Sequence, residues 1–273
     1  MTRRMISVSI LSLLIGIGAT HHTCAAEVGD VTRWNDIRPE VFGKSDIGDG
    51  SGVLALDAPT RAEDAAMVPI TIQALSPQTK ERYISKLTLI VDENPAPLVA
   101  VFHLGPQNGS ATISTRVRVN DYTNIRVVAE LSDGKLVMVS RYVKAAGGCS
   151  APAGKDQKAA LARLGKMKLI PPDHVAEGKP GIYQLLISHP NNSGLQFDQM
   201  TRNYVPAHYV KSIQVSYDGA TVLTVEPNIS ISEDPSIHFS WVADHPGTMD
   251  VKAIDSLEKV FTGSFPVTFS SGS

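Results

Sequence analysis

The chain has 273 residues, of which 42% are hydrophobic and 19% are charged, and its formal net charge at pH 7 is −2. A chain of this length and composition can bury a sizeable core in one or two domains. The acidic and basic groups nearly balance, so the chain has no excess of positive charge for binding nucleic acid, and no nucleic-acid partner is expected.

The N-terminus has the three parts of a secretory signal. Arg3 and Arg4 precede a short apolar stretch from Ile6 to Ile17, and small residues suited to cleavage follow at positions 23–26. The apolar stretch is too short to span a bilayer, so we expect residues 1–26 to be removed and no membrane span to remain. The paired arginines also fit a twin-arginine signal, which leaves both the Sec and the twin-arginine export routes open.

Loss of this signal removes Cys24 and leaves Cys149 as the one cysteine of the mature protein. An exported protein with a single cysteine cannot form an internal disulfide, and its unpaired thiol indicates reactivity or intermolecular pairing. An inert buried cysteine is the alternative. The flanking Gly147 and Gly148 argue against it.

The expected elements begin with a short helix between Asp30 and Phe42. Its apolar residues recur at intervals of three and four, which places them on one helical face: Val31, Trp34, Ile37 and Val41. Pro39 interrupts the pattern, so we expect a kink or an early stop.

From Val68 the apolar residues alternate with polar ones, which is the period of a strand with one buried face. We expect strands near 68–74, 87–91, 99–103, 111–119, 124–131 and 135–143. In the fourth of these, Arg116 and Arg118 fall on the wet face. Asp133-Gly134 indicates a tight hairpin between the last two strands.

The alternation stops between Gly147 and Gly154 and resumes in the second half. A short helix is expected within 155–164, followed by strands near 167–170, 182–188, 213–217, 237–242, 249–254 and 260–269. Asp218-Gly219 is a second hairpin signal. Each half has the roughly 100 residues of an immunoglobulin-like sandwich.

The sequence therefore predicts an all-β fold: two immunoglobulin-like antiparallel β-sandwiches joined by a flexible cysteine-bearing linker, with a short N-terminal helix. The expected divisions are a signal peptide at 1–26, a first sandwich with the helix at 27–146, a Gly/Ala-rich arm and linker at 147–165, and a second sandwich at 166–273.

Cys149 lies on a segment of small residues with nothing apolar to bury it. We expect Gly147, Gly148, Ser150 and Gly154 to form a flexible arm, because glycine moves freely and lets a partner's backbone approach closely. A plain linker with an incidental cysteine is the alternative.

The segment offers little for catalysis by the thiol itself. An unperturbed cysteine has a pKa of about 8.5, so only a few per cent is thiolate near neutrality. Lys144 and Lys155 would favour the thiolate slightly, but no histidine of the segment can act as its base. Cys149 is therefore interpreted as a covalent carrier site, and no catalytic residue is expected.

The histidines do not occur at the spacings typical of metal ligands. Each stands alone on an expected strand, turn or loop: His103, His174, His189, His208, His238 and His245. With no second cysteine after cleavage and no His-x-His pair, no metal site is expected. Nucleotide and phosphate-binding motifs are also missing from the sequence, so no cofactor is expected beyond a covalent sulfur adduct on Cys149.

Several segments resemble the SoxY and SoxZ subunits of the bacterial sulfur-oxidation system. Resemblance to SoxY lies in the early helix, in Arg61–Ala66 and in four later segments, which are Val99–His103, Ile113–Arg118, Ala129–Gly134 and Gly147–Cys149. Resemblance to SoxZ lies in Leu186–Pro190, Val215–Gly219 and His238–Trp241. The chain looks most like the fused SoxYZ-like carriers associated with quinoprotein dehydrogenases.

In that family, SoxY and SoxZ are separate sandwich subunits of a periplasmic heterodimer, and a SoxY cysteine carries thiosulfate-derived sulfur between enzymes. The resemblance implies that Cys149 is the carrier thiol, that Gly147 and Gly148 are its flexible approach, and that the SoxY-like domain packs on the SoxZ-like domain within one chain. It implies a periplasmic location. The implied partners are sulfur-oxidising enzymes, c-type cytochromes or a quinoprotein dehydrogenase system.

The sequence departs from the family pattern in two ways. The usual Gly-Gly after the cysteine is here Ser150-Ala151-Pro152, which is stiffer because proline fixes its own φ and restrains its neighbour. The arm also has no free end, because the chain continues into the second half, so we expect the thiol to move at the tip of a loop that is attached at both ends. The alternative function is a non-catalytic interaction module for an exported quinoprotein dehydrogenase or cytochrome c system, with Cys149 dispensable.

Overall fold

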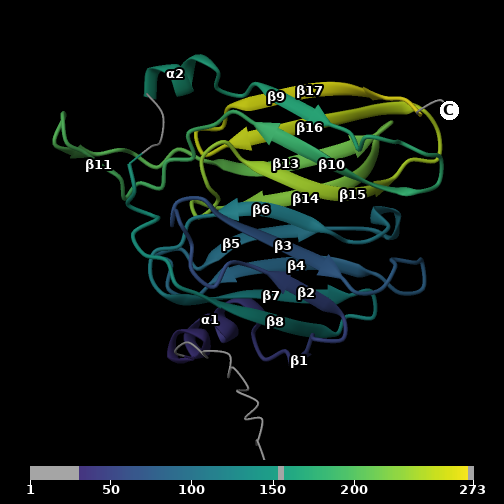
Figure 1. Cartoon of the computed structure of the whole chain (residues 1–273), viewed down its shortest axis with the longest axis horizontal. Coiled ribbons are helices and arrows are strands. Elements are labelled where there is room, and N and C mark those ends of the chain that lie inside the picture. Colours follow the sequence, from purple (N-terminus) through teal and green to yellow (C-terminus); the bar gives the residue numbers. More distant parts are fainter. Residues whose placement is uncertain (1–30, 153–156, 270–273) are drawn as a thin grey trace, which may run out of the picture.

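The computed structural model describes residues 31–152 and 157–269, which form two stacked β-sheets with little helix (Figure 1). The expected signal peptide and Gly154 lie outside these residues. Within the described ranges, no helix is both long enough and apolar enough to cross a membrane.

The first half of the chain contains one α-helix, one 3-10 turn and eight strands. In chain order these are α1 (Thr32–Phe42), β1 (Ile47–Asp49), β2 (Leu54–Asp57), β3 (Val68–Ala74), β4 (Ile84–Val91), β5 (Leu98–His103), η1 (Pro106–Asn108), β6 (Ile113–Val117), β7 (Thr123–Leu131) and β8 (Leu136–Val143).

The second half continues with one short helix and nine strands. These are α2 (Gln157–Ala162), β9 (Met167–Ile170), β10 (Pro180–Ile187), β11 (Phe197–Asp198), β12 (Asn203–Tyr204), β13 (Val210–Tyr217), β14 (Ala220–Pro227), β15 (Ser236–Val242), β16 (Gly247–Asp255) and β17 (Val260–Val267). Both predicted Asp-Gly hairpins are confirmed, because β7 pairs with β8 and β13 pairs with β14 in antiparallel fashion.

The two main sheets run without a break through both halves of the chain. The larger sheet has the order β1-β8-β7-β4-β5-β14-β13-β16-β17, and the smaller has the order β2-β3-β6-β15-β10-β9. We call the two antiparallel pairs β5–β14 and β6–β15 the seam, because they join the halves. Phe102 lies opposite Val225 in the first pair, and Ile113 lies opposite Phe239 in the second.

The all-β sandwich architecture with a short N-terminal helix is confirmed, and the seam adds what the sequence did not predict. The halves are joined by sheet hydrogen bonds as well as by the linker. Pairing β5 with β14 and β6 with β15 satisfies backbone groups that would otherwise lie unpaired at the edges of two separate sandwiches.

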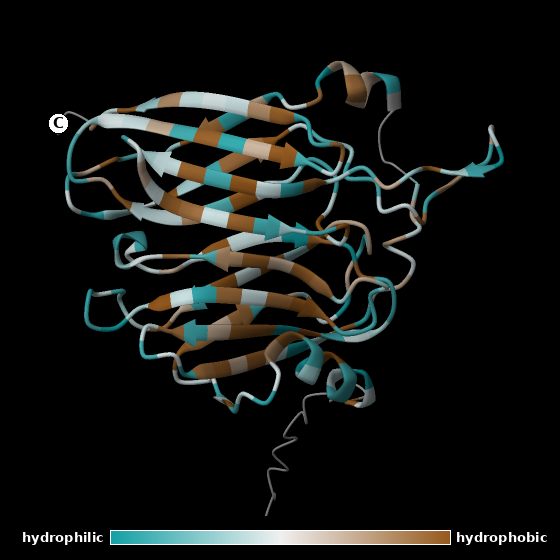
Figure 2. Cartoon of the chain, turned by 180° about the vertical axis from the view of Figure 1, so that it is seen from behind, coloured by the Kyte–Doolittle hydropathy of each residue, from teal (hydrophilic) through white to brown (hydrophobic). Residues whose placement is uncertain are grey.

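The core lies between the two sheets and is shared by both halves. In β3 the residues Val68, Ile70, Ile72 and Ala74 point inward and are buried, as their alternation predicts. Hydrophobic and hydrophilic residues alternate along most strands (Figure 2). One buried apolar cluster includes residues of every strand at the seam, which makes the two halves one packed body.

Helix α1 covers the outer face of the larger sheet. Trp34 and Ile37 are buried against β4 and β7, and the Arg126 guanidinium lies 4.7 Å from the centre of the Trp34 ring. The helix continues beyond Pro39 to Phe42, as its expected range predicted, so of the kink and the early stop left open at this proline the early stop does not occur. The contact between the rings of Trp34 and Phe42 ties the last turn to the packed part of the helix.

Candidate functional site

Cys149 lies in a tight turn directly after β8, and its side chain is completely buried, with 0% exposure. We call residues 147–150 the cysteine turn. The backbone N–H of Gly147 donates to the Asn120 carbonyl at 2.8 Å, and that of Gly148 donates to the Val119 carbonyl at 2.9 Å. The turn closes on itself through a bond from the Ser150 N–H to the Gly147 carbonyl. The expected exposed position of the thiol is therefore wrong.

The two glycines explain this burial. A Cβ placed on Gly148 would lie 2.0 Å from the carbonyl oxygen of Ala65 and 2.7 Å from that of Val119, so only glycine fits there. Gly147 has a φ of +80°, a conformation that other residues rarely adopt. The glycines, interpreted from sequence as a flexible approach, here allow close docking of backbone on backbone.

Residues of the second half hold the other side of the cysteine turn. The Ser193 hydroxyl donates a hydrogen bond to the carbonyl oxygen of Cys149. Arg118 donates through Nη1 to the Gly148 carbonyl at 3.2 Å and through Nη2 to the Asn191 carbonyl at 3.4 Å. The cysteine turn is thus held between the two halves of the chain.

The surroundings of the thiol keep it neutral. Burial raises the pKa of Cys149 from its ordinary 9.0 to about 11, and the nearby Arg118 charge opposes this rise. Among the described residues, Arg118 is the charged group that favours the thiolate, in place of the expected Lys144. The expected Lys155 lies outside the described ranges.

Arg118 is the residue of the candidate site that the sequence pattern missed. The alternation of apolar and polar residues along this strand places Arg118 on the solvent-facing side, but its side chain is only 1% exposed. It follows β6 at the seam, where the second half covers it. The Arg118 N–H donates to the Ser230 carbonyl at 2.7 Å, and this long-range contact leaves no signal in local sequence.

Two of the histidines that looked isolated in the sequence meet at a buried carboxylate. His208 Nε2 lies 2.8 Å from Asp255 Oδ2, and His189 Nε2 lies 3.7 Å from the same oxygen. The two histidine rings are 4.5 Å apart between centres, in an edge-to-face arrangement. The expectation that the histidines stand singly is therefore wrong for this pair.

This trio is the one group in the described part of the chain whose ligand atoms lie close enough to hold a metal, all within 4.8 Å of one another. The backbone N–H of Asn191 donates to His189 Nδ1 at 3.1 Å, which places the ring proton on Nε2, pointing into the group. A ring nitrogen that carries a proton cannot bind a metal. The arrangement therefore favours a buried polar group in which His208 is hydrogen-bonded to Asp255, while His189 Nε2 has no hydrogen-bond partner among the described residues.

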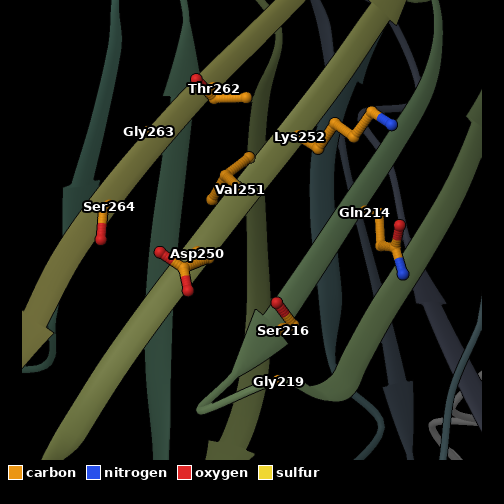
Figure 3. A pocket seen from close by; sticks show the side chains of 9 residues that line it. All are labelled: Gln214, Ser216, Gly219, Asp250, Val251, Lys252, Thr262, Gly263 and Ser264. Atoms are coloured by element: carbon orange, nitrogen blue, oxygen red, sulfur yellow. The ribbon is translucent and has the colours of Figure 1, made fainter.

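A polar hollow lies elsewhere, on the outer face of β13, β16 and β17 (Figure 3). Its side chains come from three neighbouring strands: Gln214, Ser216, Asp250, Lys252, Thr262 and Ser264. None of its lining residues contacts the cysteine turn, and it offers no thiol or imidazole. The cysteine turn remains the candidate site.

Comparisons with known families agree with the two halves. The family described as "Sulfur oxidation protein SoxY" matches residues 38–149, and the one described as "Sulphur oxidation protein SoxZ" matches residues 167–266. The two family matches define a sulfur-oxidation carrier protein. The chain belongs to the SoxYZ-like carriers, with a SoxY domain and a SoxZ domain fused in one chain.

Two solved structures are similar to part of the chain. The sulfur carrier protein SoxY from Chlorobium limicola f thiosulfatophilum is 27% identical, with 42% of this chain and 93% of that chain covered and a TM-score of 0.36. A superoxide reductase (neelaredoxin) from Ignicoccus hospitalis is 10% identical, with 40% of this chain and 90% of that chain covered and a TM-score of 0.31. No curated protein matches the chain.

Proposed function

We propose that the chain is a periplasmic carrier that holds a thiosulfate-derived sulfur group covalently on Cys149 and presents it to partner oxidising enzymes. The observation that carries this proposal is the position of Cys149. It is the last residue of the SoxY match, and its backbone is hydrogen-bonded to Ser193 of the SoxZ domain. It is also the one cysteine in the described part of the chain.

The buried position of Cys149 represents the docked state of the carrier. Four hydrogen bonds hold the cysteine turn to its surroundings: those of Gly147 and Gly148 to residues 119–120, and those from Arg118 and Ser193. Each contributes about 0.5–1.5 kcal/mol net, so undocking costs a few kcal/mol. A cost of this size leaves a small undocked population, in which the thiol meets its partners.

Loading in the undocked state joins two sulfur atoms. A disulfide bond forms between Cys149 Sγ and the terminal sulfur of thiosulfate. The thiol proton is released, and the two sulfur atoms together lose two electrons. These electrons pass to an oxidising partner, for which a c-type cytochrome or a quinoprotein dehydrogenase system is the proposed class.

The surroundings of the thiol support a carrier over a thiol enzyme. Arg118 is the charged group that acts on Cys149, and a guanidinium favours a thiolate but cannot accept its proton. Proton removal and oxidation are therefore assigned to the partners.

The complete burial of Cys149 favours one other function, an interaction module for an exported quinoprotein dehydrogenase or cytochrome c system, with the thiol dispensable. Replacing Cys149→Ser in the native host separates the two functions, and Ser85→Ala is the control because Ser85 lies on β4 and bonds the Glu130 carbonyl away from the cysteine turn. Loss of thiosulfate-dependent respiration with unchanged folding supports the carrier. Full activity of Cys149→Ser overturns it and supports the module.

A further inference from the structure

Arg118 is a buried cation beside Cys149 that forms no direct ion pair with any of the described residues. Its Nη1 and Nη2 donate to the carbonyls of Gly148 and Asn191, and its Nε has no hydrogen-bond partner. The side chain is 1% exposed, and the carboxylates of Glu233 and Asp64 attract its charge without forming an ion pair with it. The site therefore offers a positive charge and an unused donor directly next to the cysteine turn.

Stability does not explain this arrangement. Burying a guanidinium that is not paired directly with a carboxylate is costly, and the attraction of the more distant Glu233 and Asp64 offsets that cost only in part. Burial lowers the pKa of Arg118, which shows that the protein interior disfavours its charge. The neutral Cys149 thiol supplies no compensating charge in the docked state. An anion that arrives later would supply it.

Arg118 is also held rigidly at the seam. The backbone N–H of Arg118 donates to the Ser230 carbonyl at 2.7 Å, and Asn94 Nδ2 donates to the Arg118 carbonyl at 2.8 Å. Its backbone is thus fixed by contacts from both domains, and a donor fixed in this way can recognise an anion of defined geometry.

We propose that Arg118 is the anion-binding group of the carrier and pairs with the terminal sulfonate of a sulfur adduct on Cys149. This proposal rests on the carrier function proposed above. In the unloaded chain, Arg118 Nη1 holds the Gly148 carbonyl; in the loaded chain, a sulfonate oxygen takes the place of this carbonyl and a second oxygen reaches Nε. Hydrogen bonds between arginine and an oxyanion are roughly twice as strong as neutral ones. Arg118 therefore retains sulfonate-ended adducts in preference to uncharged ones.

Two adducts of similar size test this preference in the full chain. Tetrathionate attacked by the Cys149 thiolate gives Cys149–S–S–SO3⁻ and releases thiosulfate. Methyl methanethiosulfonate gives the uncharged Cys149–S–S–CH3 and releases methanesulfinate. The rate at which dithiothreitol cleaves each adduct is followed by intact mass in the parent protein and in Arg118→Met. Arg116→Met is the matched control, because Arg116 lies two residues earlier on β6 and bonds the distant Asp234 carbonyl.

Arg118→Met is expected to accelerate cleavage of the sulfonate-ended adduct about tenfold more than cleavage of the methyl adduct. Arg118→Lys keeps the charge but loses the parallel N–H donors of the guanidinium, so its effect on the two cleavage rates is expected to lie between those of the parent and Arg118→Met. Arg116→Met is expected to affect both adducts alike. An equal effect of Arg118→Met on both adducts overturns the proposal.

If Arg118→Met does not fold, the parent protein gives the decisive measurement. Its sulfonate-ended form must unfold at a higher temperature than its methyl form, and equal unfolding temperatures overturn the proposal. Failure here is distinct from failure of the carrier function, because both adducts are made chemically. A carrier whose Arg118 shows no charge preference still loses its activity in Cys149→Ser.

Discussion

The hydroxyl of Ser193 donates a hydrogen bond to the carbonyl oxygen of Cys149, which links the SoxZ domain to the one cysteine described in the SoxY domain. The bond reaches the backbone of the cysteine, so it holds the position of the turn and leaves the thiol itself free of a partner. Docking of the carrier thiol is therefore a property of both domains, and fusing them in one chain keeps the two contributions together.

Replacing Ser193→Ala removes this link, and we expect it to favour the undocked state. One hydrogen bond is worth about 1 kcal/mol net, so alkylation of Cys149 by iodoacetamide should accelerate roughly fivefold. The control is Ser85→Ala, which breaks a comparable hydroxyl–carbonyl bond to Glu130 away from the site. Equal alkylation rates in the two variants would show that Ser193 does not hold the turn.

Gly148→Ala should have a much larger effect. The added methyl would lie 2.0 Å from the Ala65 carbonyl oxygen, and backbone on both sides leaves it no room. We expect alkylation of Cys149 to accelerate on the order of 100-fold, with the sheets intact by circular dichroism. Gly52→Ala serves as the control, because a Cβ there meets nothing within 4 Å. Slow alkylation in Gly148→Ala would contradict the tight docking described above.

The raised pKa of Cys149 makes docking depend on pH. Because the docked state favours the protonated thiol, its stability is fully present below the ordinary pKa of 9.0 and is lost as the pH rises toward 11. The alkylation rate should therefore continue to increase between pH 9 and 11 in the parent protein. In Gly148→Ala it should level off near pH 9, and the same plateau in the parent would contradict a buried thiol.

His189 should make the fold sensitive to acid. Burial and then the neighbouring His208 lower the pKa of His189 from 6.5 to about 4, while Asp255 opposes this change. The neutral ring is favoured in the folded chain, so its stabilising contribution is present above pH 6.5 and is lost as the pH falls toward 4. Between pH 7 and 4.5, the unfolding temperature of the parent should fall roughly 5 °C more than that of His189→Gln.

The control for this measurement is His174→Gln, because His174 is exposed. Its unfolding temperature should follow the parent at every pH. Parallel curves for the parent and His189→Gln would mean that this histidine is not held neutral by the fold.

Local patterns in the sequence were sufficient for most elements of the fold. The alternation in β3 and the Asp-Gly turns after β7 and β13 depend on neighbouring residues alone, so periodicity and turn chemistry predict them. Helix α1 was also expected, and it ends at Phe42, where the expected range ended. Pro39 suggested an early end, and the packing of Trp34 and Ile37 on the sheet outweighs the cost of that proline.

The burial of the site could not be predicted in this way. Arg118 alternates as a wet-face residue of its own strand, and only the second domain makes that position an interior one. Gly148 was interpreted as flexible because the sequence does not show that the Ala65 backbone lies against it. His189, His208 and Asp255 meet through three separate loops and strand ends. Each of these features depends on contacts between residues that are distant in the sequence.

The central claim is that Cys149 carries sulfur, and the mass of the native protein tests it most directly. The protein is purified from its own host during growth on thiosulfate, without reductant, and its intact mass and Cys149 peptide are measured beside the Cys149→Ser form. Added sulfur or sulfonate is expected on a fraction of Cys149, with an unmodified mass for Cys149→Ser. A Cys149 thiol that is unmodified in every preparation would contradict it.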